Sequence, residues 1–372
     1  MRVGCTYRLI DLVINLGINL LAAAIAAFIG WRWRQFRLRK QTLRTQRPSD
    51  QGRERGLDFL MVGCCFLGLV LGADLLRPHF LAYSLRSQTA DLVRKPKWIA
   101  YEPSNWNPSQ SESLELDSVT EELFWIKQAG FDGVITFTSR GDFAEIPRLA
   151  KGRGLAVIMG IWDPQNYDEI RAAISQREFV DAYCVGHDGW PYRYSYEVLV
   201  KAIDHVRFRT GHPVSTTQRI NYYLNDKRFL SLGDWLFPDT LLPLMDKDLY
   251  VHTVNVQRDV AITIELANKL DQINPGGKPI LLKMVGYPAQ LDDYDSHLSD
   301  DAQTKFFIAL GNAQRDVGTS LSTNISISMY SAFDMSWKHG PPFYDWESQT
   351  GLFERDGRPR PAVWEIIKRS LR

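Results

Sequence analysis

Residues 279–288 read PILLKMVGYP, and the fold of this chain can be worked out from this stretch. A proline is followed by an apolar run of strand length, and the run ends in Gly286-Tyr287-Pro288, which is typical of a turn. We therefore predict a strand that ends at a ligand-binding loop. The segments on either side decide what kind of sheet this strand joins.

Seven other stretches of the chain have a comparable strand-like pattern, and all eight lie downstream of residue 96. Each is a short apolar run that ends near a polar or turn-forming residue. The eight predicted strands are 97–103, 133–137, 155–162, 181–188, 213–218, 234–239, 279–288 and 326–334.

Amphipathic segments separate these strands and have helical spacing of their apolar residues. Two of them end at a glycine suited to a helix stop, Gly130 and Gly211, and the last one begins with Pro361. Eight strands alternating with helices over residues 97–372 have the size and rhythm of a (β/α)₈ TIM barrel. The rival fold is a doubly wound open sheet, but no glycine-rich phosphate turn follows the first strand.

Charge divides the chain into two parts. Residues 1–96 carry a net charge of +9, and residues 97–372 carry a net charge of −8. A basic segment followed by an acidic domain indicates a membrane-proximal region and a separate soluble part. The acidic domain argues against a nucleic-acid partner, because phosphates require a basic surface.

The basic part contains two apolar stretches, 9–31 and 57–76, each long enough to span a bilayer. Between them, residues 32–56 hold nine Lys/Arg and two acidic residues, so the positive-inside rule places this loop in the cytoplasm. We therefore predict a transmembrane hairpin over residues 1–76 in the inner or plasma membrane, with residues 77–96 as a linker. The barrel would then lie on the periplasmic or extracellular side.

A polar stripe on the first predicted span suggests a partner for it. Asp11, Asn15 and Asn19 share one helical face, and such groups in hydrocarbon usually face another helix. The stripe either packs on the second span or docks another membrane subunit, such as a polysaccharide synthase.

Cysteine and histidine usage gives no sign of a disulfide or a metal site in the barrel. Cys184 is the one cysteine downstream of residue 96, so no disulfide can form within that part. The histidines lack the close spacing of a zinc site. We therefore expect neither a metal nor a cofactor.

The predicted strand ends, where barrel enzymes place their chemistry, are rich in polar and aromatic residues. Hydroxyl groups of a sugar need hydrogen bonds, and the C–H face of its ring packs on an aromatic plane. The sequence therefore predicts a sugar-binding groove. Its candidate binding residues are Glu102, Trp106, Trp162, Asp163, His187, Trp190, Tyr287, Asp334 and Trp337.

Several phrases at these strand ends resemble the bacterial branch of glycoside hydrolase family 17, which is a family of β-1,3-glucanase-like barrels. YCVGHDGW (183–190) resembles the family's Val-Gly-Asn-Glu segment, and KMVGYPAQ (283–290) resembles its Glu-Thr-Gly-Trp-Pro-Ser segment. SAFDMSWK (331–338) and the tail after residue 347 resemble two further motifs. The resemblance covers roughly residues 97–370 and implies a TIM barrel that acts on β-glucans.

The departures from the family pattern bear on activity. By this resemblance Asp188 stands where the family has its acid/base glutamate, and Met284 stands where it has its nucleophile. His187 replaces an asparagine, and Ser331 replaces a glutamate. A thioether cannot form the glycosyl ester of a retaining mechanism, and the shorter aspartate retreats by about 1 Å.

Three functions remain open. The first is a degenerate glycoside hydrolase that binds a β-glucan-type polysaccharide beside a membrane synthase or export complex. The second is an active hydrolase or transglycosylase with Asp188 as the acid and Glu102, Asp163 or Asp239 as the base. The third is a structural subunit of a membrane complex in which the groove is vestigial.

Overall fold

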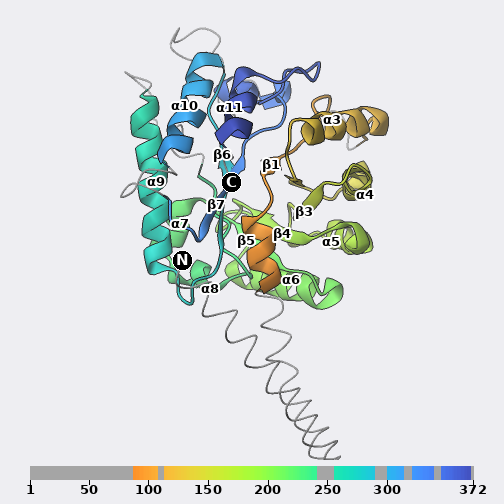
Figure 1. The fold of residues 1–372 in the computed structure, drawn as a ribbon. Coiled ribbons are helices and arrows are strands. Elements are labelled where there is room, and N and C mark those ends of the chain that lie inside the picture. Colours follow the sequence, from red (N-terminus) through yellow and green to blue (C-terminus); the bar gives the residue numbers. More distant parts are fainter. Residues whose placement is uncertain are drawn as a thin grey trace, which may run out of the picture. The chain divides into compact units, whose positions relative to one another are not determined.

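The computed structural model describes residues 87–107, 113–240, 255–289, 300–313, 321–338 and 345–369 (Figure 1). All of these residues belong to one compact unit that runs from His79 to Arg372. The predicted hairpin, with spans 9–31 and 57–76, lies outside the described residues. Within the described ranges, no helix has both the length and the apolar character needed to cross a bilayer.

A parallel sheet curls into the centre of the unit. The strand order is β5-β4-β3-β2-β1-β7-β6, so strands that follow one another in the sequence are neighbours in the sheet, except β5 and β6, and β1 pairs with β7. The strands are β1 (Trp98–Ala100), β2 (Gly133–Ile135), β3 (Ala156–Ile161), β4 (Ala182–His187), β5 (Val214–Thr217), β6 (Ile280–Val285) and β7 (Ile325–Met329).

Residues 234–240 lie between β5 and β6 and occupy the place of the one strand that the seven-stranded sheet lacks for a ring of eight. Leu236 and Asp239 form parallel bridges to Ile280 and Lys283 of β6, and Asp239 also bridges to Arg219. These contacts are single bridges rather than a continuous ladder. The predicted TIM-like α/β barrel is therefore confirmed as seven parallel strands, nearly closed by a segment in the predicted place.

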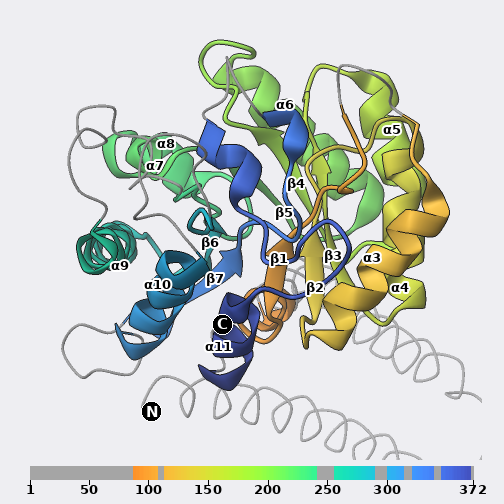
Figure 2. The ribbon, with the colours of Figure 1, turned by 90° about the horizontal axis from the view of Figure 1, so that it is seen from above.

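Helices surround the barrel, as seen from above in Figure 2. The α-helices are α3 (Leu116–Gln128), α4 (Ile146–Gly152), α5 (Tyr167–Ser175), α6 (Tyr196–Thr210), α7 (Ile220–Asn225), α8 (Lys227–Ser231), α9 (Val256–Ile273), α10 (Asp300–Ala313) and α11 (Pro361–Arg369). The 3₁₀ turns are η2 (Gly141–Glu145), η3 (Arg177–Phe179), η5 (Ser336–Lys338) and η6 (Asp345–Gln349).

Local sequence signals explain where several of these helices begin and end. The Asn166 side chain accepts hydrogen bonds from two backbone N–H groups at the start of α5, and Ser195 caps α6 in the same way. Helix α6 ends at Gly211, whose φ of 73° is left-handed. This agrees with the predicted helix stop.

The N-terminal end of the barrel interior is closed by a helix over residues 87–94. Val93 of this helix is fully buried against Trp98, Trp235 and Phe237, and the Trp98 indole donates a hydrogen bond of 3.2 Å to the Leu92 carbonyl. We call this cluster of Val93, Trp98, Trp235 and Phe237 the barrel floor. Residues 87–94, expected within a linker over 77–96, thus form part of the barrel domain.

Strands β4 and β6 each contain an irregularity near their C-terminal end. Between Cys184 and His187 the register of β4 advances three residues against two in β5, and β6 shows the same excess between Leu282 and Val285. Each is a β-bulge, a feature that redirects the side chains beyond it. Among the described non-glycine residues, positive φ angles occur at Asp188 (45°) and Met284 (62°), at or beside these bulges.

Candidate functional site

A group of charged side chains occupies the barrel interior above the floor, at the C-terminal ends of the strands. It includes buried groups from the ends of β1, β4 and β6, and Lys338 of η5 reaches it from the loop after β7. We call the set Glu102, His187, Asp188, Asp239, Lys283 and Lys338 the mouth cluster. Buried charges are rare unless they are paired and hydrogen-bonded, so each member needs a partner.

The bulge in β4 turns His187 into the barrel. Ala182 and Cys184 face the barrel interior, so strict alternation along the strand would point the side chain of residue 187 toward the outer helices. The extra residue of the bulge, at Gly186 (φ 76°), reverses the direction and points His187 inward. His187 therefore meets Lys283 across the barrel, with 2.8 Å between Nδ1 and Nζ.

Burial and nearby cations, with Lys283 foremost, hold the pKa of His187 well below its ordinary value. The imidazole is therefore neutral at neutral pH, and Lys283 donates the hydrogen bond to Nδ1. Burial also lowers the pKa of Lys283, although nearby acidic groups oppose that shift.

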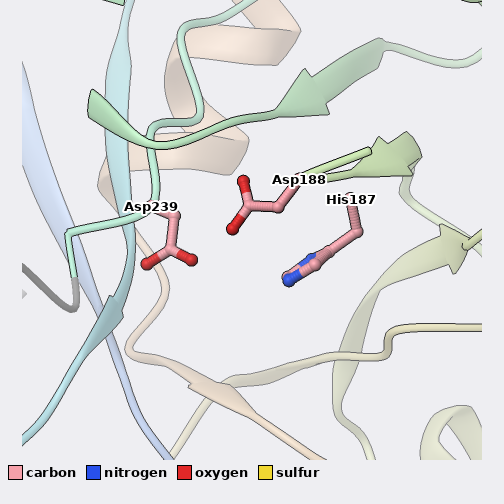
Figure 3. Close-up of side chains that lie close together, drawn as sticks. All are labelled: His187, Asp188 and Asp239. Atoms are coloured by element: carbon pink, nitrogen blue, oxygen red, sulfur yellow. The ribbon is translucent and has the colours of Figure 1, made fainter. Parts of the chain in front are cut away.

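Asp188 and Asp239 form a carboxyl pair beside this contact. In Figure 3 the two carboxyl groups point toward each other, with the His187 ring directed at the space beside them. Burial raises the pKa of Asp188 well above its ordinary value, and the charge and hydrogen bond of Asp239 raise it further. Two carboxylates in such contact cannot both ionise at low cost, so Asp188 retains a proton and donates it to Asp239.

Glu102 and Lys338 form the third part of the mouth cluster. Lys338 Nζ lies 3.9 Å from Glu102 Oε2 and donates a hydrogen bond of 2.8 Å to the Tyr330 hydroxyl. Burial raises the pKa of Glu102, and the lysines partly offset this. Burial disfavours the Lys338 charge, but Tyr330 and Glu102 outweigh it and raise the pKa of Lys338. Lys338 is therefore held charged, and the pKa values of the two buried lysines shift in opposite directions.

A ligand atom of each of His187, Asp188 and Asp239 lies within 4.8 Å of the others, which is a spacing that can hold a metal ion. The Lys283 amine lies 2.8 Å from His187 Nδ1, however. A divalent ion bound through His187 Nδ1 would have to displace the Lys283 amine from that nitrogen. We therefore interpret His187, Asp188 and Asp239 as a group of hydrogen-bonded side chains that can exchange protons, rather than as metal ligands.

The structure brings some of the predicted site residues to this cluster. Glu102, His187 and Asp188 belong to it. The Trp162 ring stacks on His187 at 5.0 Å, and Trp337 lies 5.0 Å from Lys338 Nζ. Trp106 meets Trp337 edge to face at 5.4 Å, so the two tryptophans form one aromatic wall near the cluster.

Two other predicted site residues, Tyr287 and Trp190, pack against the helices around the barrel and not against the mouth cluster. Tyr287 stacks on Phe306 of α10 at 5.0 Å, and its hydroxyl donates to Asp259 of α9. This side chain is therefore bound on the helix side of the sheet. Trp190 packs edge to face on Tyr222 and Phe229, both at 5.1 Å.

Two predicted carboxylates are engaged in local contacts. Asp334 accepts hydrogen bonds from the Gly351 backbone and the Arg360 guanidinium, at 2.8 and 2.6 Å. Asp163 lies 4.0 Å from Arg140 and accepts a hydrogen bond from the Gln165 backbone. Neither contact connects to the mouth cluster.

Met284, aligned with the family nucleophile, is buried in the hydrophobic core, with 6% of its surface exposed. The neighbouring Lys283 carries the polar group that β6 directs into the barrel. Lys283 was not among the predicted site residues, although a lysine within the apolar run ILLKMV was a usable signal.

No family model and no curated protein matches this chain. Solved structures do match its fold. A GH5_18 enzyme from Bifidobacterium longum subsp. longum has a TM-score of 0.54 at 13% identity, with coverage of 73% of this chain and 78% of that one. An endo-laminarinase from Formosa Hel1_33_131 has a TM-score of 0.55 at 14% identity, with coverage of 74% and 87%. A β-glucuronidase from Bifidobacterium dentium has a TM-score of 0.52 at 14% identity, with coverage of 73% and 45%.

These neighbours are glycosidases, and they include enzymes of glycoside hydrolase family 5. The chain therefore has the fold of a glycosidase-type barrel, which confirms the predicted resemblance at the level of architecture. Membership of family 17 in particular is not supported by these matches. Sequence identities this low establish the fold alone, and function has to be argued from the site.

Proposed function

We propose that this protein binds a glycan at the mouth of its barrel without cleaving it by a retaining mechanism. One observation carries the proposal: the aromatic wall of Trp106 and Trp337 lies beside the mouth cluster. The family resemblance would place Met284 at the nucleophile position, and this side chain is buried in the core. An aromatic wall beside charged hydrogen-bonding groups suits a sugar ring. A thioether supplies no nucleophile for a glycosyl ester.

The structural neighbours support the choice of ligand class. They include a GH5_18 enzyme in complex with Manβ1-4GlcNAc, an endo-laminarinase, and a β-glucuronidase in complex with a glucuronide. These ligands and activities belong to those proteins. Together they favour a β-linked oligosaccharide as the first class to test, and a β-glucan within that class remains our proposal.

The experiment is a calorimetric titration of the full-length protein with β-1,3-gluco-oligosaccharides, Manβ1-4GlcNAc and a glucuronide, with product analysis of the same samples. We expect binding without cleavage. Trp337→Ala should weaken binding about tenfold, which corresponds to about 1.4 kcal/mol. Trp364→Ala is the matched control, because Trp364 of α11 is 57% exposed and lies outside the aromatic wall. Equal loss in both variants, or no binding to any of the three ligands, contradicts the proposal.

A second candidate function is hydrolysis or transglycosylation with Asp188 as the acid. The observation that favours it is the contact between the Asp188 and Asp239 carboxyl groups, which together with burial raises the pKa of Asp188. The hydrogen-bonded pair is closer than the separation of about 5–5.5 Å used by retaining enzymes or about 6.5–9.5 Å used by inverting ones. Turnover of any tested oligosaccharide that Asp188→Asn abolishes would establish this function instead.

We further propose that the barrel is tethered to the membrane and serves polysaccharide synthesis or export. The apolar stretches 9–31 and 57–76 and the basic segment between them support the tether. A reporter fused after residue 372 should be active outside the cytoplasm, and one fused within residues 32–56 should be active inside it. The opposite pattern would reject this topology.

A further inference from the structure

We propose that Lys283 is a reactive amine that forms an imine with a small hydroxyaldehyde at the mouth of the barrel. The inference goes beyond glycan binding and does not depend on it. It starts from the position of Lys283 on β6, where Leu281 and Lys283 face the barrel interior and 1% of the lysine surface is exposed. A single charged residue in an otherwise apolar strand needs a reason, since burial of an ammonium group costs several kcal/mol.

The surroundings of Lys283 Nζ favour the uncharged amine. Its close polar contact is the neutral His187 imidazole at 2.8 Å, and the rings of Phe137 and Phe237 lie at 4.3 and 5.5 Å. A ring face attracts a buried cation less strongly than the water that burial removes. Burial is accordingly the largest influence on the pKa of Lys283, and it lowers that pKa.

Carboxylates near Lys283 are each engaged with another partner. Asp188 and Asp239 share a proton, so the two carry about one negative charge rather than two. Glu102 faces Lys338 at 3.9 Å. Lys338 is a second buried lysine in the same mouth, and its partners hold it charged. The pKa values of the two lysines therefore shift in opposite directions although the two side chains are similarly buried.

The same cluster supplies the proton transfers that imine formation requires. Lys283 Nζ attacks the aldehyde carbon, and the carbonyl oxygen takes the proton of Asp188 to give a carbinolamine. The nitrogen then returns a proton to the carboxylate pair, and the pair protonates the hydroxyl group, which leaves as water. The resulting iminium gives its N–H proton back to the pair, so that amine and aldehyde give imine and water and the pair ends with the proton it began with. A buried carboxyl with a raised pKa beside an amine suits both transfers.

The low exposure of the side chains around Lys283 limits the size of a ligand that can reach its amine. Asp188 is partly exposed, whereas His187 and Glu102 are each less than a tenth exposed and Lys283 is 1% exposed. A reagent must therefore be small to reach the amine. The hydroxyl groups of a short open-chain sugar find hydrogen-bonding partners in these same side chains.

The test uses glycolaldehyde and cyanoborohydride at pH 6 with the full-length protein, followed by peptide mass mapping. The hydride reduces the imine to a stable secondary amine on the lysine that formed it. We expect Lys283 to be modified at least tenfold faster than Lys338 and faster than the exposed Lys201. Lys283→Arg removes the amine but keeps a cation, so its adduct should vanish. Lys338→Arg should leave the Lys283 adduct in place.

Circular dichroism and a thermal transition check that both variants fold. Modification of surface lysines with none at Lys283, in the folded wild-type protein, overturns the proposal. Glycolaldehyde forms no sugar ring and does not report on glycan binding. A failure here and a failure to bind oligosaccharides are therefore distinguishable.

Discussion

The two ends of the barrel interior are built from the same strands and have opposite chemistry. At the floor, Trp98, Trp235 and Phe237 are fully buried and pack on Val93. At the mouth, the same ring of strands buries Lys283 and His187. The floor is apolar packing, which stabilises a fold in proportion to the area it removes from water.

The mouth contributes differently, because each buried charge there has to be offset by a hydrogen bond or an opposite charge. Replacing such groups with apolar ones often costs little stability, whereas loss of a buried ring costs several kcal/mol. The difference therefore separates the part of the barrel that maintains the fold from the part available for function. Four changes test that separation.

The largest effect is expected from Trp235→Ala at the floor. Removal of a fully buried indole that packs 5.7 Å from the Phe237 ring should destabilise the protein by about 3–5 kcal/mol. Urea unfolding followed by circular dichroism measures it. Trp364→Ala on the surface is the control and should change stability by about 0.5 kcal/mol or less. Similar losses in both would mean that the floor is not the stabilising end.

The second effect concerns the bulge that directs His187 inward. In Gly186→Ala the new Cβ would lie 2.5 Å from the Tyr194 hydroxyl at a φ of 76°, so we expect a loss of about 2 kcal/mol. Gly211→Ala has the same sign of φ, at 73°, but no atom within 4 Å, and should lose about 1 kcal/mol. Urea midpoints of the two variants test this order. A larger loss for Gly211→Ala would show that crowding at the bulge is unimportant.

The third effect is on pH dependence. Because the folded-state pKa of His187 is lowered, this group contributes stability above its unfolded pKa of about 6.5 and loses it as pH falls through the folded value. His187→Gln should therefore reduce the loss of unfolding free energy between pH 7 and pH 5 by about 1–2 kcal/mol. Parallel denaturation curves at the two pH values measure the difference. An unchanged pH slope would mean that His187 is not held neutral.

The smallest effect on stability is expected from Lys283→Met combined with Asp239→Asn. The double change replaces an amine and a carboxyl group of the same cluster with uncharged side chains of similar size, so the unfolding free energy should shift by about 1 kcal/mol or less. Urea unfolding beside Trp235→Ala makes the comparison direct. A loss as large as that of Trp235→Ala would place the mouth cluster among the groups that hold the fold.

The strands of the barrel could be predicted because their signals are local. The stretches 181–188 and 279–288 contain β4 and β6, since an apolar run bounded by turn residues is visible within a short window. The predicted strand at 234–239 occupies its expected place but forms only isolated bridges. Its tryptophan and phenylalanine contribute to the floor more than to the ladder.

The site was predicted in part, because its assembly depends on register. Asp188, His187 and Glu102 were recognised from their positions at strand ends. The contact between His187 and Lys283 joins residues 96 positions apart and requires the bulge in β4. Alternation along a strand does not reveal an extra residue of this kind. The family resemblance therefore drew attention to Met284 rather than to Lys283.

The helix over residues 87–94 has a practical consequence for handling the protein. It seals the end of the barrel opposite the mouth, and Val93 is fully buried there. The chain therefore enters the described part of the barrel domain, at residue 87, on the side opposite the mouth. A fragment that starts at residue 97 would lack this helix and would leave Trp98, Trp235 and Phe237 without their contact to Val93.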